Sequence, residues 1–170
     1  DPAHQEAFEA LERLHTAAGR WETLVELYLN RLETRETVTE RSDILRRIAR
    51  VFEEKIGDKN QAFDALVTAF ADDFGDDETA RYLEKMAQAT NRWGELINTA
   101  NAWLPEQTDN KTKIQLCLRL GKWYGEDLGH FEYAQPYYAQ IVALDPNTVQ
   151  VLRQMAAIHR KGAAWQKVGE

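Results

Sequence analysis

The sequence GRWETL at residues 19–24 returns as NRWGEL at residues 91–96, and a third tryptophan, Trp165, follows after the same interval. When residues 1–72 are laid over residues 73–144 without a gap, 14 positions are identical and many others keep their apolar character. A tandem duplication with a period of 72 residues therefore organises this chain. Such repeats have to be recognised before any other fold is considered, because they define the architecture.

Apolar residues recur at helical spacing inside each copy. Ile44, Ile48, Phe52 and Ile56 follow one another at intervals of four residues, which places them on one face of a helix. Strict alternation over the length of a strand is missing. The pattern predicts about ten helices, over residues 3–18, 20–34, 39–56, 58–72, 76–90, 92–104, 111–128, 130–143 and 147–161, with a last one beginning at 163–170.

Residues that terminate helices stand between these segments. Gly57 and Gly129 close two of the predicted helices, and Pro105 ends another. The run Asp76-Asp77-Glu78 places acidic side chains where backbone N–H groups point at the start of a helix. The connections are short, and no linker divides the chain.

Burial explains why such hairpins stack. A single pair of helices leaves an apolar face in water, and each fully buried Leu, Ile or Phe contributes about 1.5–3 kcal/mol. Only the next hairpin can cover that face, so the array grows in one dimension. We predict one all-α solenoid over residues 1–170. Because these residues stop partway through a predicted helix, the array is expected to be a segment of a longer protein.

The segment 117–146 carries the spacing of a known repeat. It contains Leu120-Gly121, Tyr124, Ala134, Tyr138 and Pro146, and in this it resembles the tetratricopeptide repeat family. The segment 45–74 is similar. The resemblance implies a right-handed α-solenoid of antiparallel helix hairpins, with about four and a half divergent units that begin near residues 5, 42, 77, 114 and 149. The units that contain Trp21 and Trp93 depart from the family pattern because they lack the glycine.

The five tryptophans fall into two groups. Trp21, Trp93 and Trp165 share one repeat phase, which is typical of core packing. Trp103 and Trp123 do not recur. They are the better candidates for a partly exposed aromatic residue with a functional role, although packing is the favoured interpretation for both.

The amino-acid composition limits the classes of partner that this chain is expected to bind. The 170 residues include 21 Lys and Arg against 28 Asp and Glu, for a net charge of −7. That charge disfavours wrapping a nucleic-acid backbone or an anionic membrane surface, so neither is expected as a partner. No apolar run approaches the length of a transmembrane helix. The single cysteine, Cys117, cannot form an internal disulfide. A cytoplasmic location is favoured, while the compartment stays open.

Motifs for chemistry are missing from the sequence. The four histidines, His4, His15, His130 and His159, have no metal-ligand spacing. Cys117 lies on the apolar face of its helix without an identifiable base, which favours a buried structural thiol over a nucleophile. We therefore expect no catalytic residue, no metal and no cofactor in this chain, and predict that it is not an enzyme.

The family resemblance also implies a binding face. In tetratricopeptide repeats the first helix of each unit lines the concave groove, and its fifth, ninth and twelfth positions contact peptides. Seven of the ten fifth and ninth positions here are basic. The candidate partner-binding residues are Arg13, Arg46, Arg50, Arg81, Lys85, Lys122 and Arg153, with Arg160 at a twelfth position.

A stripe of positive charge on an acidic protein suggests an acidic guest. The leading hypothesis is a protein–protein interaction scaffold whose groove holds an acidic segment of a partner protein, extended or helical. An equally weighted alternative is that Glu6, Asp43, Glu53 and Glu78 neutralise the stripe through solvated ion pairs.

Two other functions remain open at this stage. The chain is alternatively a structural spacer or a self-assembling segment whose ends associate. RNA binding by a helical repeat is disfavoured by the net acidity.

Overall fold

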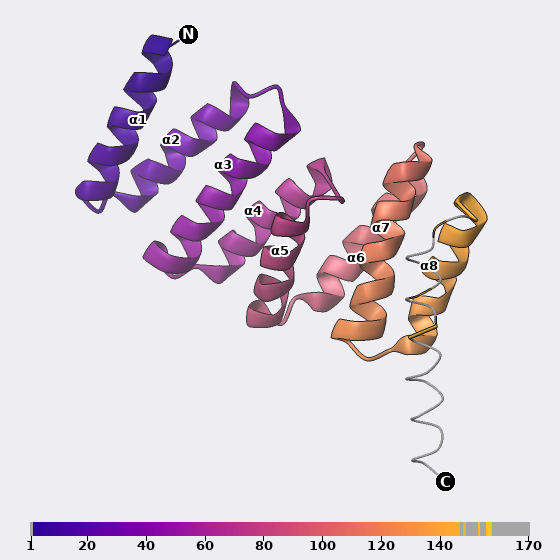
Figure 1. The fold of residues 1–170 in the computed structure, drawn as a ribbon. Coiled ribbons are helices and arrows are strands. Elements are labelled where there is room, and N and C mark those ends of the chain that lie inside the picture. The colour runs from indigo at the N-terminus through magenta and orange to yellow at the C-terminus, as the bar shows by residue number, and fades with distance from the viewer. Residues whose placement is uncertain (1, 147, 149–152, 154–155, 158–170) are drawn as a thin grey trace. The chain divides into compact units, whose positions relative to one another are not determined.

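The computed structural model describes residues 2–146, 148, 153, 156 and 157. Within these residues the chain is built from helices, and no strand is present. Figure 1 shows the succession of helices. The all-α prediction is confirmed, and none of the described helices is long and apolar enough to cross a membrane.

The chain divides into two compact units, residues 1–93 and residues 94–170. The first unit contains α1 (Pro2–Ala17), α2 (Trp21–Glu33), α3 (Val38–Val51), α4 (Lys59–Asp72) and α5 (Asp77–Thr90). The second contains α6 (Trp93–Trp103), which begins at the boundary, α7 (Asn110–Lys122) and α8 (Phe131–Leu144). In the first unit each helix from α1 to α4 packs against the next one.

The predicted turn residues form the helix ends. Thr37 caps α3 by accepting a hydrogen bond from the Glu40 amide, and Asp58 caps α4 in the same way. Asp76 caps α5 by accepting from the amides of Glu78 and Thr79. Each cap satisfies amides that have no partner inside the helix. The predicted helix start at Asp76 is therefore confirmed.

The 72-residue duplication is present in the backbone itself. The described residues with positive φ are Gly19, Gly57, Asn91 and Gly129. They form two pairs separated by 72 residues, Gly19 with Asn91 and Gly57 with Gly129. Both members of each pair end a helical segment in the left-handed region, which glycine and asparagine tolerate best.

Two predicted helices end differently from the expectation. The spans 39–56 and 111–128 are not α-helical throughout, because each finishes in a π-helical turn, at Phe52–Ile56 and Trp123–Asp127. The Asp58 amide donates to the Phe52 carbonyl at 2.8 Å, and the His130 amide donates to the Tyr124 carbonyl at 2.7 Å. These two bonds are again 72 residues apart, so the wider turn is a property of the repeat.

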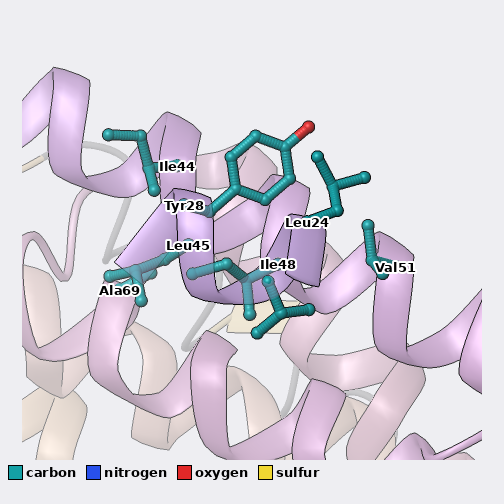
Figure 2. Close-up of a cluster of buried hydrophobic side chains, with 8 residues drawn as sticks. Leu24, Tyr28, Ile44, Leu45, Ile48, Val51 and Ala69 are labelled. Carbon is teal, nitrogen blue, oxygen red and sulfur yellow. The ribbon is translucent and has the colours of Figure 1, made fainter. Parts of the chain in front are cut away.

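A core cluster in the first unit joins α2, α3 and α4 (Figure 2). Figure 2 labels Leu24 and Tyr28 from α2, Ile44, Leu45, Ile48 and Val51 from α3, and Ala69 from α4. These residues exclude water along the contact between successive hairpins, which is the burial that was expected to make the hairpins stack.

A core cluster in the second unit repeats this arrangement between α7 and α8. It is formed by Cys117, Ala134, Tyr138 and Ile141. Their counterparts 72 residues earlier, Leu45, Ala62, Leu66 and Ala69, are also buried. The predicted burial of Cys117 is confirmed.

The described tryptophans differ in how deeply they are buried. Trp123 has no exposed surface, which confirms packing, the interpretation that the sequence favoured, and rules out partial exposure of this residue. Its counterpart Val51 is also buried, which shows that this helical position points into the core. Trp103, Trp21 and Trp93 are half-buried, and Trp21 packs against the edge of the first core cluster.

Some predicted features lie outside the described residues. Trp165, His159, Arg160 and the predicted helix over residues 163–170 are among them. So is most of the predicted helix over residues 147–161.

Candidate functional site

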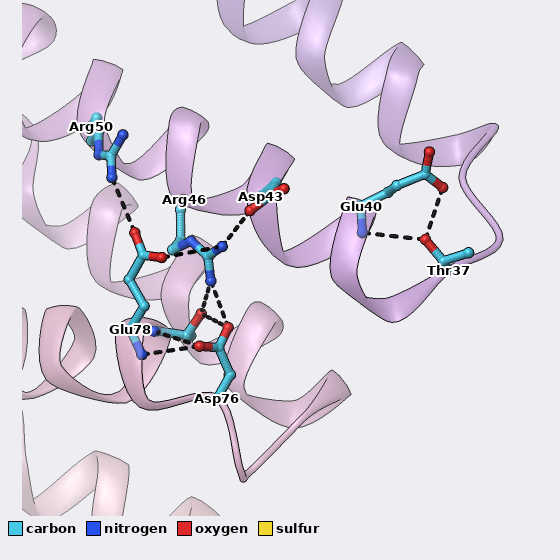
Figure 3. Close-up of polar contacts among 8 residues, drawn as sticks. Thr37, Glu40, Asp43, Arg46, Arg50, Asp76 and Glu78 are labelled. Carbon is cyan, nitrogen blue, oxygen red and sulfur yellow. Dashed lines mark hydrogen bonds and ion pairs between the residues drawn. The ribbon is translucent and has the colours of Figure 1, made fainter.

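Arg46 joins α3 to the start of α5 and is only 8% exposed. Its guanidinium donates to the Asp76 carboxylate at 2.5 Å and to the Thr79 hydroxyl at 3.0 Å. It also donates to Asp43 on its own helix and lies 3.6 Å from a Glu78 oxygen (Figure 3). Three carboxylates and one hydroxyl therefore surround one buried cation, and the group holds two first helices of adjacent hairpins together.

Asp76 serves both the helix cap and this ion-pair network. Burial alone raises the pKa of its carboxyl group, but the Thr79 hydroxyl and the amides of Thr79 and Glu78 donate to it, and Arg46 adds a positive charge. The pKa of Asp76 therefore lies below its ordinary value. This carboxylate is fully ionised at neutral pH and keeps the Arg46 network intact.

The expectation of uncompensated positive charge is wrong for Arg46, because its charge is matched within the protein. The sequence alternative, neutralisation by nearby acids, correctly named Asp43 and Glu78 as partners of the stripe. Asp76 was not among those acids.

Arg50 and Lys85 are themselves exposed, and each has an acidic partner. Arg50 lies 3.3 Å from Glu78, and both side chains are more than half exposed. Lys85 lies 2.7 Å from Glu53. The Tyr82 hydroxyl donates to the same Glu53 carboxylate at 2.7 Å. Although burial raises the pKa of Glu53, these two donors outweigh it and hold the pKa below its ordinary value.

A pocket of about 600 Å³ opens between α3 and α5. We call its lining the α3–α5 surface, which consists of Arg50, Glu53, Glu54, Asp77, Glu78, Arg81, Tyr82 and Lys85. The structure thus brings three of the predicted binding residues, Arg50, Arg81 and Lys85, to one pocket. Arg81 is exposed and has no hydrogen bond or ion pair within the described part of the chain.

The α3–α5 surface has mixed charge. Three cations face four carboxylates, those of Glu53, Glu54, Asp77 and Glu78. Such a lining selects a guest by the positions of its charges more than by its overall charge, because a carboxylate is attracted opposite Arg81 and repelled opposite Asp77.

The remaining candidate residues lie elsewhere. Arg13 is exposed on α1 and makes no hydrogen bond or ion pair to any described residue. Lys122 on α7, in the second unit, lies 3.3 Å from Asp127. Arg153 is exposed, and Arg160 lies outside the described residues.

A second pocket in the first unit was missed by the sequence analysis. It has a volume of about 190 Å³ and lies between α1, α2 and α3. We call it the Trp21 pocket, lined by Thr16, Trp21, Leu24, Tyr28, Arg47, Arg50, Val51, Glu54 and Lys55. The only signal in the sequence was Trp21, which the repeat phase assigned to the core.

Side chains that could bind a metal or act as a nucleophile are few within the part of the chain that the structure describes. No set of three His, Cys, Asp or Glu residues there is arranged to hold a metal ion. Burial raises the pKa of the Cys117 thiol to about 11, so this sulfur is a weak nucleophile at neutral pH.

These observations define an all-α helical-repeat protein in which ion pairs and apolar clusters join successive hairpins. The sequence model of the tetratricopeptide repeat family matches residues 7–42. This segment therefore matches a tetratricopeptide repeat, and the described residues around it form further helices packed in succession. A repeat of this family supports, in general terms, a role as a scaffold for protein–protein interactions.

The matched segment is unexpected in one respect. Residues 7–42 form the unit that contains Trp21, which departs from the family pattern in the sequence analysis. The match begins within two residues of the predicted unit start at residue 5 and ends at the next predicted start, residue 42. The predicted unit length is therefore supported at this position, even though the glycine is missing.

Solved structures with a similar arrangement include two described as MamA. One is 14% identical, with a TM-score of 0.47, and the match covers 89% of this chain and 84% of that one. Another is 16% identical, with a TM-score of 0.46 and coverage of 96% and 90%. No curated protein matches the sequence.

Proposed function

We propose that this chain is a non-enzymatic protein-interaction module whose α3–α5 surface binds an acidic segment of a partner protein. Arg81 is the observation that supports the proposal. It is exposed at a pocket of about 600 Å³ and has no charge partner within the described residues. A carboxylate from a bound segment supplies that partner, and the segment itself is extended or helical.

The neighbouring cations are available at low cost. The Arg50–Glu78 pair is exposed on both sides, and Lys85 is exposed beside Glu53. An exposed pair such as Arg50–Glu78 contributes about 0–1 kcal/mol, so a ligand carboxylate replaces it without a large penalty, while Glu53 keeps its hydrogen bond from Tyr82 if Lys85 turns to the ligand. Arg46 does not contact the ligand in this proposal. It aligns α3 with α5 and so positions the pocket.

A peptide-display selection on the intact chain tests the proposal. Peptides selected by the wild-type protein are expected to be enriched in Asp and Glu. Their affinity should fall at least tenfold in the triple variant R50E/R81E/K85E, which keeps Arg46. The matched control R20E/K59E/K111E introduces the same charge change at three exposed cations outside the pocket. Selected peptides that lack acids, or equal losses in both triple variants, would overturn the proposal.

A second candidate function, self-association, is favoured by one exposed face of α1. Leu11 and Leu14 are 42% and 57% exposed. The residues one unit later, Ile48 and Val51, are only 2% and 8% exposed, because they pack with α2 in the first core cluster. The α1 face therefore has the composition of a hairpin contact but lacks a cover among the described residues.

Sedimentation velocity over a range of protein concentrations tests this second function. If α1 mediates association of two copies, L11E/L14E abolishes the concentration dependence, while L29E/V38E leaves it unchanged. Leu29 and Val38 are exposed apolar residues on other helices, so they match the chemical change. A wild-type protein that stays monomeric at all concentrations excludes this function.

A further inference from the structure

The Trp21 pocket adjoins the α3–α5 surface, since Arg50 and Glu54 line both. We propose that the Trp21 pocket binds one bulky apolar side chain of the acidic segment that occupies the α3–α5 surface. This inference rests on the proposed function and adds a second recognition element to it. The preferred ligand is therefore an acidic segment with a Leu, Met or Phe, and not a uniformly acidic one.

The floor of the Trp21 pocket is apolar. Leu24, Tyr28 and Val51 belong to the first core cluster, and Trp21 packs against that cluster. The Tyr28 hydroxyl already donates to Glu12 at 2.5 Å, so the tyrosine presents its ring to the pocket while its polar atom is occupied. A polar side chain entering here finds no free side-chain partner on Leu24, Tyr28 or Val51 and loses its hydrogen bonds to water. An apolar side chain gains burial instead.

Volume limits the guest to one side chain. Pockets for drug-sized ligands measure about 300–1,000 Å³, whereas the Trp21 pocket measures about 190 Å³. The larger pocket, between α3 and α5, then holds the remainder of the segment.

The rim of the Trp21 pocket favours acidic neighbours for that side chain. Arg47, Arg50 and Lys55 outnumber the single acid Glu54. The Lys55 ammonium lies 5.5 Å from the centre of the Trp21 ring, so a cation stands at the mouth of the pocket. Carboxylates on either side of the apolar residue are attracted to this rim. Arg47 and Arg50 also pair with Glu12 and Glu78 outside this lining, so Lys55 is the cation of the rim that has no ion pair among the described residues.

Fluorescence anisotropy with designed peptides tests the proposal on the intact chain. The probes are fluorescein-labelled peptides of Glu, Ser and Gly, in which a single Phe is moved through successive positions. Control peptides carry Ala in place of Phe, or Gln in place of every Glu. For wild-type protein, the best Phe peptide is expected to bind about tenfold more tightly than its Ala counterpart, as the burial of one large apolar side chain predicts.

Two variants locate the effect. Thr16→Trp fills the pocket from its exposed rim and should make the Phe and Ala peptides bind equally. Thr68→Trp places the same side chain on an exposed position of α4, outside both pockets, and should keep the tenfold preference. In a ¹H–¹⁵N correlation spectrum, the indole signal of Trp21, assigned with Trp21→Phe, should shift with the Phe peptide and not with the Ala peptide.

The outcomes separate the two proposals. If Phe and Ala peptides bind wild-type protein equally and R50E/R81E/K85E weakens both, the Trp21 pocket is not a recognition element while the proposed function stands. If the Gln peptide with Phe binds as tightly as its Glu parent, the acidic part of the proposed function fails. A Phe preference that survives Thr16→Trp overturns the assignment of the pocket.

Discussion

Gly121 on α7 lies directly against the ring of Tyr138 on α8. A Cβ atom on residue 121 would stand 2.7 Å from Cζ and 2.9 Å from Cε1 of that ring. The counterparts of these residues 72 positions earlier are Ala49 and Leu66, both fully buried. The two copies therefore pack the same helix contact with different residues. One copy places glycine against a large ring, and the other places alanine against a smaller side chain.

We predict that Gly121→Ala destabilises the protein, because the methyl group overlaps a buried ring. Overpacking of this kind costs about 1–3 kcal/mol. Chemical denaturation followed by circular dichroism measures the change in unfolding free energy. The double variant G121A/Y138L recreates the pairing of Ala49 with Leu66 and should recover part of the loss. A double-mutant cycle without coupling between the two positions would contradict this account.

The hydroxyl of Tyr138 provides an independent check of the same contact. It is buried without a hydrogen-bond partner. Removing an unsatisfied buried group costs little and can stabilise. Tyr138→Phe is therefore expected to be neutral or stabilising, in contrast to Gly121→Ala.

We predict that Arg46→Ala destabilises the chain much more than Arg50→Ala. Arg46 is buried among Asp43, Asp76 and Thr79, and removing it leaves carboxylates without their cation at a helix contact. Losing one partner of a buried pair costs about 3–5 kcal/mol. The exposed Arg50 pair contributes about 0–1 kcal/mol. Thermal and urea unfolding of both variants make the comparison, and equal losses would mean that Arg46 is not a structural residue.

Much of the fold could be predicted from local signals. Gly57 and Gly129 mark helix ends because few other residues adopt their left-handed backbone. Asp76 marks a helix start because its carboxylate accepts from free amides. The burial of Cys117 follows from its place on the apolar face of α7. Each feature depends on residues close in sequence, so periodicity and capping chemistry suffice.

Other features could not be predicted from periodicity and capping chemistry. The π turns at Phe52–Ile56 and Trp123–Asp127 leave the apolar periodicity unchanged. The sequence pattern therefore does not indicate them. Trp123 lacks a matching tryptophan in the other copy, but its counterpart Val51 is buried. Both positions therefore lie in the core, although the two residues differ in kind.

The candidate site was predicted in part for the same reason. Register along each helix correctly brings Arg50, Arg81 and Lys85 to one pocket. It does not reveal that Arg46, one turn before Arg50, meets Asp76, because that acid lies 30 residues away in the sequence. The Trp21 pocket requires three helices to be placed together, which periodicity alone does not do.

We predict that acid weakens the contact between α3 and α5. The pKa of Asp76 is lower in the folded chain than its ordinary value of 3.8. Such a group contributes stability above its unfolded pKa and loses it as the pH falls through the folded pKa. The unfolding free energy of the wild type should therefore decline as the pH drops from about 5 to about 2.

Asp76→Asn separates this contribution from general acid denaturation. The amide still caps α5 but has no charge for Arg46, so the variant should be about 1–2 kcal/mol less stable at pH 7 and show a shallower decline in acid. Asp64→Asn is the control, because Asp64 pairs with Arg92 at 2.8 Å in an exposed position. A wild-type pH dependence in D76N would show that the Asp76 carboxylate is not the group that titrates.

We predict that the Cys117 thiol does not react in the folded protein. It is fully buried, and burial raises its pKa to about 11, so at pH 8 only about one molecule in a thousand carries the reactive thiolate. The disulfide reagent DTNB should release one equivalent of thionitrobenzoate per chain in 6 M guanidinium chloride and almost none under native conditions. Because the thiol becomes accessible only when α7 and α8 separate, the slow native rate should rise in Gly121→Ala, which weakens that contact. Rapid labelling of the wild type, or a rate unaffected by Gly121→Ala, would mean that the thiol is reached by a route other than the opening of this hairpin.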